Sequence, residues 1–258
     1  MLSREKQIME YDEESVMAPV WIIKPAHGTQ SKGHVVTDNL AQVIRLLECG
    51  GSRVAQKYIE NPVCYEGRKV DCRVYILLRD ATPDHIELYA HNRCFFRIAD
   101  KQHNISSSAD LFDKKRVLSA MHLFRSESEK CEASKLPVDH DTISKLESDY
   151  GSIGFKWKDD ILPKIHVLAK ELFGGMTVAY PAMADGEMIS RALYGLDIMF
   201  EIVDDEIFPK LTEVTFCPQN NAICDAYERD EDLYRSFNND IFKCLFFGET
   251  SDDLTRIT

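Results

Sequence analysis

The length, composition and charge of the chain exclude several classes of protein. Its 258 residues, 44% of them hydrophobic, suffice for a real core in one large or two modest domains. A formal net charge of -12 argues against a nucleic-acid-binding protein, because such proteins carry a basic excess. The sequence has no apolar run approaching about 18 residues and no signal-peptide pattern, so neither a membrane span nor secretion is predicted.

The charge is unevenly distributed along the chain. From Arg53 to Lys101, nine Lys or Arg stand against seven Asp or Glu, whereas from Asp197 to Thr258 there are five against fifteen. One interpretation is that the acidic termini are solvated surface. The other is that the locally basic middle segment lies near a polyanion, either a nucleotide or an acidic peptide.

The eight cysteines include no C-x-x-C pair, and several lie inside apolar strands. This pattern favours buried, reduced thiols in a cytoplasmic protein. The cysteines are Cys49, Cys64, Cys72, Cys94, Cys131, Cys217, Cys224 and Cys244.

The first predicted elements form a hairpin. Residues 19–25 (PVWIIKP) read as a strand, residues 26–34 as a polar loop with glycines, and residues 35–37 as a second strand, so a hairpin-like flap is expected. Residues 53–59 are predicted to form the next strand.

A helix is predicted between these strands. Asp38 or Asn39 can cap it, and Gly50-Gly51 can stop it after Leu47. Its apolar face would contain Leu40, Val43, Ile44 and Leu47.

The middle of the chain predicts two long strands and then a loop. Residues 69–80 and 84–100 are rich in aromatic and branched side chains and are joined at Thr82-Pro83. Between residues 101 and 150 the sequence is polar, rich in serine and weakly periodic, so a loop-rich insertion is expected.

The last third predicts helices around two further strands. Residues 161–173 read as an amphipathic helix ended by Gly174-Gly175, and residues 232–247 as a final helix. Strands are expected at residues 195–201 and 210–216. A mixed sheet with flanking helices indicates an α+β or α/β fold.

Lys24, at the end of the apolar run WIIKP, is the first candidate for chemistry. It is either an ordinary surface lysine or a cation for nucleotide phosphates. Asp197 lies among apolar neighbours, where a carboxylate needs a partner. On the next predicted strand, alternation places Leu211, Glu213 and Thr215 on one face. Two acids on adjacent strands, with no Lys or Arg beside them, repel unless a divalent cation lies between them, although a lone buried acid more often belongs to a salt bridge.

Lys69, Asp71 and Arg73 stand at alternate positions and are expected to share one face of their strand. Arg97, near the end of the paired strand, can join them. That face is either a solvated surface or a site for phosphate or carboxylate oxygens, which suit the fork of Arg and the point charge of Lys.

Five motifs in order carry a resemblance over nearly the whole chain: WIIKP, QKYIENP, GRKVDCRVYILL, RALYGLDIMFE and LTEVTFCP. The sequence resembles the tubulin-tyrosine ligase-like family. The resemblance implies an ATP-grasp fold, in which β-rich lobes hold ATP and Mg²⁺, and an activity that activates a carboxylate as an acyl phosphate and joins an amino acid to it. The family adds tyrosine, glutamate or glycine to tubulin, so tubulin or another acidic protein tail is the implied partner, in the cytoplasm and at microtubules.

The resemblance also implies roles for individual residues. Lys24 matches the lysine at the nucleotide phosphates, residues 26–33 with Gly33 match the flap over them, and Asp197 and Glu213 match the Mg²⁺ ligands. The adenine hinge corresponds to Gln56, Lys57, Tyr58 and Ile59. The positions that face phosphates or the acceptor carboxylate correspond to Lys69, Asp71, Arg73 and Arg97, with Lys69, Arg73 and Arg97 as the expected catalytic cations.

The chain departs from the family pattern at three places. Thr215 stands where an asparagine is usual as a third metal ligand; a threonine hydroxyl can bind Mg²⁺ but is a shorter ligand. The flap reads Ser31-Lys32-Gly33-His34 in place of Gly-x-Gly, and a His-Leu-Thr-Asn stretch is reduced to VLSAMH from Val117 to His122.

The resemblance predicts a division into two parts. Residues 1–60 would be the remainder of the central lobe with flap and hinge, and residues 61–258 the carboxy-terminal lobe with the metal site. The amino-terminal domain of the family is expected to be missing, which would leave an exposed apolar face.

Three functions remain open from the sequence: a catalytically weakened regulator or scaffold in tubulin modification, an active ATP- and Mg²⁺-dependent amino acid ligase, and a small-molecule ATP-grasp ligase with no protein acceptor.

Overall fold

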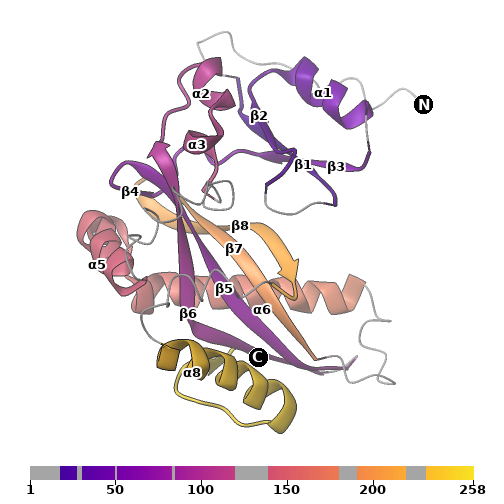
Figure 1. Cartoon of the computed structure of the whole chain (residues 1–258), viewed down its shortest axis with the longest axis vertical. Helices are drawn as coiled ribbons and strands as arrows, with labels where there is room; N and C mark the ends of the chain where they lie inside the picture. The colour runs from indigo at the N-terminus through magenta and orange to yellow at the C-terminus, as the bar shows by residue number, and fades with distance from the viewer. Residues whose placement is uncertain are drawn as a thin grey trace. The chain divides into compact units, whose positions relative to one another are not determined.

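The structure is a computed structural model, and it describes residues 18–27, 31–49, 51–82, 85–119, 139–179, 191–218 and 231–258. The chain divides into two compact units, Met1–Tyr58 and Ile59–Thr258. Figure 1 shows the elements of each unit, and each unit is described by itself.

The first unit is a three-stranded antiparallel sheet with one helix. Its strand order is β2-β1-β3, so the hairpin and the following strand predicted from the sequence are confirmed. Lys24, near the end of β1, lies opposite Val54 of β3 in the register. The elements are β1 (Trp21–Pro25), β2 (Val35–Thr37), α1 (Leu40–Glu48) and β3 (Arg53–Lys57).

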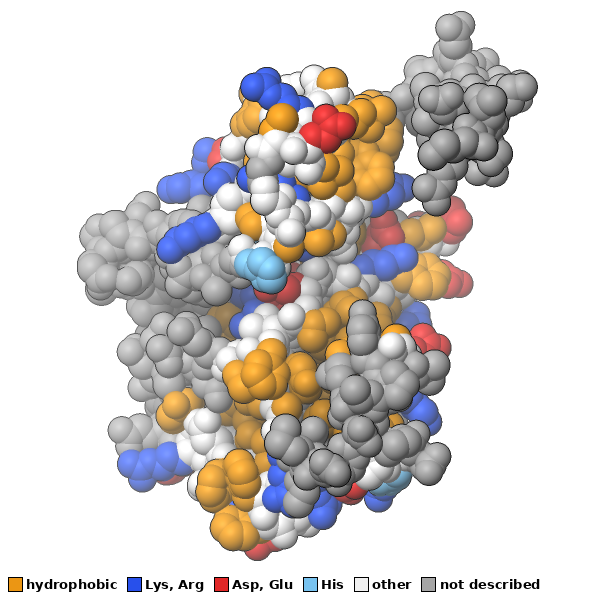
Figure 2. Space-filling model, turned by 90° about the vertical axis from the view of Figure 1, so that its right-hand side faces the viewer, with side chains coloured by type: hydrophobic (Ala, Val, Ile, Leu, Met, Phe, Trp, Pro, Cys, Tyr) orange, Lys and Arg blue, Asp and Glu red, His pale blue; other side chains and the backbone are white. Residues whose placement is uncertain are grey.

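Helix α1 begins at the predicted cap. The side chain of Asn39 accepts a hydrogen bond from the backbone N–H of Gln42, at 3.1 Å. Of the four predicted apolar positions, only Val43 is buried; Leu40 is 60% exposed and Ile44 48% exposed. Exposed apolar side chains, drawn in orange in Figure 2, are seen on the molecular surface. Much of the apolar face of α1 therefore remains open to solvent within this unit.

The second unit is built on a six-stranded antiparallel sheet. Its strand order is β8-β7-β5-β6-β9, and β4 also pairs with β5. The predicted α+β class is therefore confirmed, and the short C-terminal strand β9 is an addition. The strands are β4 (Cys64–Tyr65), β5 (Arg68–Thr82), β6 (His85–Gln102), β7 (Ala192–Val203), β8 (Glu206–Phe216) and β9 (Leu254–Arg256).

The helices of the second unit are of several kinds. They are α2 (Ser108–Phe112), α3 (Lys114–Val117), α5 (Asp139–Tyr150), the 3₁₀ turn η2 (Gly151–Ile153), the π-helical segment η3 (Trp157–Ile161), α6 (Leu162–Ala179), α8 (Glu231–Phe242) and the π-helical segment η5 (Lys243–Phe247). The helix predicted at residues 232–247 is confirmed, with a π-helical last turn.

Alternation along the strands divides the side chains between the two faces of this sheet. On one face, Val70, Cys72 and Val74 of β5 pack in the main apolar core with η3 and α6. On the other face, Tyr75 and Leu77 pack with α8 and η5 in a smaller core. That second face also carries the charged side chains of Asp71 and Arg73, which belong to the candidate site.

Two predictions about helices are wrong. Residues 139–150 lie in the segment expected to be a loop, but they form α5, whose Leu146 is fully buried in the main core. Gly174-Gly175 do not end α6, which continues to Ala179. A glycine weakens a helix interior by only about 1 kcal/mol, and buried Phe173 and half-buried Met176 hold this part of α6 against the core.

A β-bulge changes the predicted face pattern of β8. Asp197 lies opposite Glu213 and Ile198 lies opposite Leu211, so Thr212 is an extra residue. Strict alternation had predicted that Leu211 shares a face with Glu213 and Thr215. Because of the bulge, Leu211 instead packs toward the main core.

The prediction of buried cysteines holds for Cys72, Cys94 and Cys244 and is wrong for Cys49 and Cys217, which are exposed. Cys64 is half-buried, and all six described cysteines are free thiols. Cys131 and Cys224 lie outside the described residues.

Among the helices that the structure describes, none combines the length and the apolar character needed to cross a bilayer.

Candidate functional site

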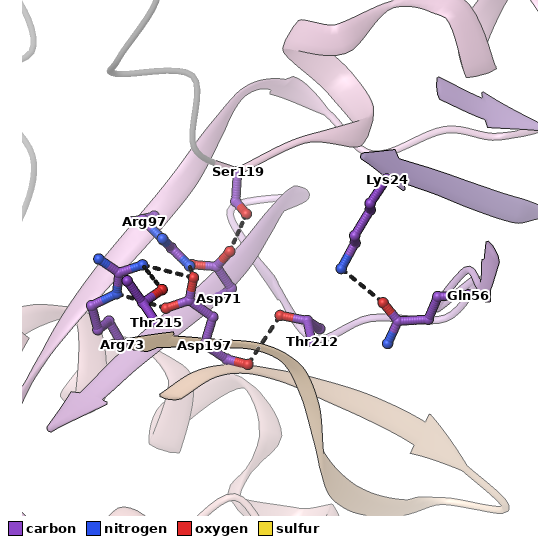
Figure 3. A network of polar contacts seen from close by, with 9 residues as sticks. All are labelled: Lys24, Gln56, Asp71, Arg73, Arg97, Ser119, Asp197, Thr212 and Thr215. Carbon is purple, nitrogen blue, oxygen red and sulfur yellow. Dashed lines mark hydrogen bonds and ion pairs between the residues drawn. The ribbon is translucent and has the colours of Figure 1, made fainter. Parts of the chain in front are cut away.

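Four charged side chains meet on the face of the larger sheet that lies opposite the main core. We call Asp71, Arg73, Arg97 and Asp197 the charge cluster (Figure 3). The register brings them together, because Asp71 lies opposite Arg97 and Arg73 lies opposite Asp197 on neighbouring strands. Side chains directly opposite each other point to the same face, so the four groups converge.

Two guanidinium groups hold the carboxylate of Asp197. Arg73 Nε donates to Asp197 Oδ1 at 2.7 Å, and Arg73 Nη2 donates to Oδ2 at 2.9 Å. Arg97 Nη2 lies 2.9 Å from the same Oδ2. The Arg73 contact is the bidentate geometry that a guanidinium fork makes with carboxylates and phosphates.

Asp71 occupies the other end of the charge cluster. Arg97 Nε donates to Asp71 Oδ1 at 2.6 Å, and the Ser119 hydroxyl donates to Asp71 Oδ2. Arg97 therefore bridges the two carboxylates through different nitrogens.

Arg97 and Asp197 keep their charges although they are buried. Asp71, Arg97 and Asp197 are each less than 9% exposed. Burial opposes the charge of Arg97, but Asp197 and Asp71 together raise its pKa above the ordinary value. Burial likewise opposes the charge of Asp197, and Arg97 and Arg73 lower its pKa below the ordinary value. Each charge is stable because its partner lies in the same poorly hydrated space.

Lys69 reaches the segment that follows the cluster in sequence. Its ammonium group donates to the backbone carbonyl of Val117, at 2.8 Å, and the side chain is 4% exposed. Lys69, Asp71 and Arg73 thus share one face, as alternation predicted. The interpretation of that face as a solvated surface is wrong for Lys69 and Asp71, which are buried.

Sequence reasoning missed Ser119 and the Val117 carbonyl as partners of the cluster. Both lie in the VLSAMH stretch, which the family pattern had singled out only as a reduced binding element. Thr212 was also missed: its hydroxyl donates to the backbone carbonyl of Asp197 at 3.0 Å, from the bulge of β8. No local signal in the sequence indicates these long-range bonds.

In the first unit, Lys24 and Gln56 come together. Lys24 Nζ donates to Gln56 Oε1 at 2.7 Å, between the neighbouring strands β1 and β3. Two residues with expected nucleotide roles are therefore in contact. Lys57 is exposed and Tyr58 is buried, and the boundary between the two units falls between Tyr58 and Ile59.

Gly33 of the expected flap has a backbone that only glycine adopts readily. Its φ is +77°, and an added Cβ would lie 3.1 Å from Pro25 Cγ. Residues 28–30 of the flap lie outside the described residues.

The three expected metal ligands lie on β7 and β8. Glu213 is opposite Asp197 and is exposed, and Thr215 is opposite Gly195. The Thr215 hydroxyl accepts a hydrogen bond from Arg73 Nη2 at 3.3 Å. Within the described part of the chain, no group of three His, Cys, Asp or Glu side chains is arranged to hold a metal.

Asp197 does have basic neighbours, contrary to the prediction that no Lys or Arg stands beside the two acids. Asp197 has two arginines, one from β5 and one from β6, because the sheet brings distant parts of the sequence side by side. The donors still fit Mg²⁺ by chemistry, since carboxylate and hydroxyl oxygens are the hard ligands it prefers. To bind a cation, however, Asp197 must give up contacts with guanidinium groups.

Comparison with known proteins decides the family. The model of the Tubulin-tyrosine ligase family matches residues 1–253. The chain belongs to the tubulin-tyrosine ligase family. A member from Caenorhabditis elegans, tubulin-tyrosine ligase-like protein 12, is 26% identical over 246 residues, which cover 93% of this chain and 34% of the relative.

Other members of the tubulin-tyrosine ligase family are similar to a comparable degree. Tubulin-tyrosine ligase-like protein 12 of Mus musculus is 28% identical over 92% of this chain and 36% of its own length. A probable tubulin polyglutamylase of Mus musculus is 25% identical over 94% of this chain and 42% of its own length. The chain therefore spans about a third of the length of the protein 12 relatives.

Proposed function

We propose that the chain is an ATP- and Mg²⁺-binding module of the ATP-grasp type with weakened ligase activity, acting as a regulator or scaffold in tubulin modification. Membership of the tubulin-tyrosine ligase family supports the nucleotide site and the class of reaction. The names of the relatives support tubulin, or another acidic protein tail, as the partner.

The observation that carries the weakened activity is the state of the expected metal ligands. Both carboxylate oxygens of Asp197 already accept hydrogen bonds from arginines, and Thr215 replaces a longer amide ligand. A cation would gain one shared carboxylate, the exposed Glu213 and a short hydroxyl. This is a poorer set of donors than two available carboxylates and an amide oxygen.

The residues of the site have separable roles in this proposal. Lys24 and the segment from Gln56 to Ile59 hold the nucleotide, and Asp197, Glu213 and Thr215 hold Mg²⁺. When bound, ATP and Mg²⁺ supply the phosphoryl group and neutralise its charge. The cations Lys69, Arg73 and Arg97 orient phosphate or acceptor carboxylate oxygens and stabilise negative charge that develops there.

A second candidate function is an active ligase that adds tyrosine, glutamate or glycine. The observation that favours it is the retention of the charged positions of the site, which the sheet brings together in one buried cluster. Preorganised cations in a dehydrated site are the main requirement for this chemistry.

The test is a repair experiment on Thr215. Incorporation of radiolabelled tyrosine, glutamate or glycine into tubulin is measured for the unsubstituted chain, for Thr215→Asn, and for Thr215→Asn combined with Glu213→Ala. The proposal predicts background incorporation for the unsubstituted chain, a clear increase for Thr215→Asn, and a return to background for the double variant. Turnover well above background in the unsubstituted chain favours the second candidate, and no gain with Thr215→Asn contradicts a defect confined to the metal ligands.

The identity of the acceptor is tested by competition. If a protein tail is the acceptor, an acidic tubulin-tail peptide reduces the incorporation of label into tubulin and itself supports ADP release, because it is an alternative acceptor. If ADP release in the presence of free amino acid is insensitive to the peptide, the chain is a small-molecule ligase.

A further inference from the structure

We infer that Asp197 acts as an internal anion that competes with the phosphates of a nucleotide for Arg73 and Arg97, and that a divalent cation relieves this competition. The inference rests on the proposed function and concerns the regulation of the same site. It assigns to Asp197 an inhibitory contact in addition to its expected role as a metal ligand.

The proposed competition rests on the contacts within the cluster. Arg73 presents Nε and Nη2 to the two oxygens of Asp197, at 2.7 and 2.9 Å. This two-pronged arrangement is the one that a guanidinium group makes with a phosphate. Arg97 is also engaged through two nitrogens, but with two different carboxylates: Nε contacts Asp71 and Nη2 contacts Asp197. A phosphate that takes the N–H groups engaged in these contacts must displace a carboxylate.

Charge balance explains why one ligand alone binds weakly. The four side chains of the cluster carry two positive and two negative charges, and three of them are less than 9% exposed. A phosphate without a cation would leave uncompensated negative charge in this space, where screening by salt is weak. A cation without a phosphate would leave positive charge beside the displaced guanidinium groups.

The two ligands consequently assist each other. A cation that takes the Asp197 carboxylate frees donors for the phosphate, and a phosphate that takes the guanidinium groups frees the carboxylate for the cation. Such coupling is reciprocal by thermodynamic necessity. Thr215 belongs to the same exchange, because Arg73 Nη2 also donates to its hydroxyl at 3.3 Å.

The test compares metal-free ATP binding to the whole 258-residue chain and to Asp197→Asn, in EDTA, by calorimetric titration. Asn keeps the shape but removes the competing charge. We expect Asp197→Asn to bind metal-free ATP tighter by on the order of 10-fold, and to lose the further gain that Mg²⁺ gives the unsubstituted chain. Asp253→Asn is the matched control, because Asp253 accepts a hydrogen bond from Arg93 at 2.6 Å outside the cluster. The affinity of this variant for metal-free ATP should equal that of the unsubstituted chain. Equal or weaker metal-free binding by Asp197→Asn overturns the inference.

A second measurement uses the unsubstituted chain, in case Asp197→Asn does not fold. Sulfate mimics a phosphate group and associates only weakly with Mg²⁺, so its affinity is measured in MgCl₂ and in KCl at equal ionic strength. The inference predicts that Mg²⁺ strengthens sulfate binding by about 5-fold or more. Identical affinities in the two salts contradict it.

The outcomes separate the inference from the proposed function. If ATP with Mg²⁺ does not bind the unsubstituted chain, both fail. If ATP with Mg²⁺ binds, but Asp197→Asn gains nothing and sulfate is insensitive to Mg²⁺, the proposed function stands and the inference is wrong.

Discussion

At Arg97, one guanidinium group contacts two buried carboxylates. Nε contacts Asp71 and Nη2 contacts Asp197, and the side chain is 8% exposed. Removing a partner from a buried ion pair costs more than the pair itself contributes, because it leaves an uncompensated charge. The cluster is thus a stabilising unit as well as a candidate site.

We expect Arg97→Met to lower the free energy of unfolding by about 3 kcal/mol or more in urea titrations. Arg93→Met is the control, since Arg93 pairs with Asp253 nearer the surface and should cost less than about 1 kcal/mol. Similar losses for the two variants would contradict a special role for the buried charges.

His91 is a second buried titratable group, outside the site. Its ring is fully buried, its Nδ1 accepts from the backbone N–H of Arg93, and its Nε2 lies 3.7 Å from Asp240 Oδ2 of α8. Burial lowers the pKa of His91 to about 4; Asp253 opposes this shift and Arg93 adds to it. The folded protein therefore holds this imidazole neutral.

The sign of the resulting pH dependence follows from linkage. Below about pH 6.5 the unfolded chain binds a proton at His91, whereas the folded chain does not until the pH approaches 4. His91 thus contributes stability that is fully present above pH 6.5 and falls by roughly 3 kcal/mol as the pH falls to 4. We expect the stability of His91→Gln to fall less steeply than that of the unsubstituted chain across this range. The control His140→Gln, at an exposed position, should follow the curve of the unsubstituted chain. Parallel curves for His91→Gln and the unsubstituted chain would show that His91 is not responsible.

At the scale of elements, glycines have different effects in different places. Gly175 lies inside α6, and an added Cβ would meet nothing within 4 Å. Gly248, after η5, has φ +72°, and an added Cβ would lie 2.6 Å from Arg79 Nη2. The first position tolerates a side chain and the second does not.

We therefore expect Gly175→Ala to raise the free energy of unfolding by about 0.5–1 kcal/mol, because alanine loses less backbone entropy in a helix. Gly248→Ala should lower it by about 1–2 kcal/mol, the cost of a left-handed conformation for a residue with a Cβ. Thermal unfolding of the two variants measures both effects. Destabilisation by Gly175→Ala would contradict a helical conformation at residue 175.

Most elements follow from the sequence, but their register does not. Alternation correctly predicts that Lys69, Asp71 and Arg73 share a face, and burial of Asp197 among apolar neighbours correctly predicts a partner. The partners themselves depend on pairing between β5 and β7, which are far apart in the chain, and local patterns contain no information on that pairing. The bulge at Thr212 and the contact of Ser119 with Asp71 are unpredictable for the same reason.

At the scale of the whole molecule, the site residues lie in two compact units. Lys24, Gly33 and Gln56 belong to the first unit, and the charge cluster and the expected metal ligands belong to the second. The proposed function predicts that substitutions in either unit weaken nucleotide binding.

The most direct test is a thermal-shift titration with ATP, with and without Mg²⁺, on the unsubstituted chain, Lys24→Ala and Glu213→Ala. The exposed Glu249→Ala is the control. ATP at 100 times its dissociation constant should add about 2.7 kcal/mol to stability, which gives a clear rise in melting temperature. We predict a shift that requires Mg²⁺, is lost in Lys24→Ala and in Glu213→Ala, and persists in Glu249→Ala. The absence of a shift in the unsubstituted chain, or a shift that neither substitution reduces, would contradict a role of these residues in nucleotide binding.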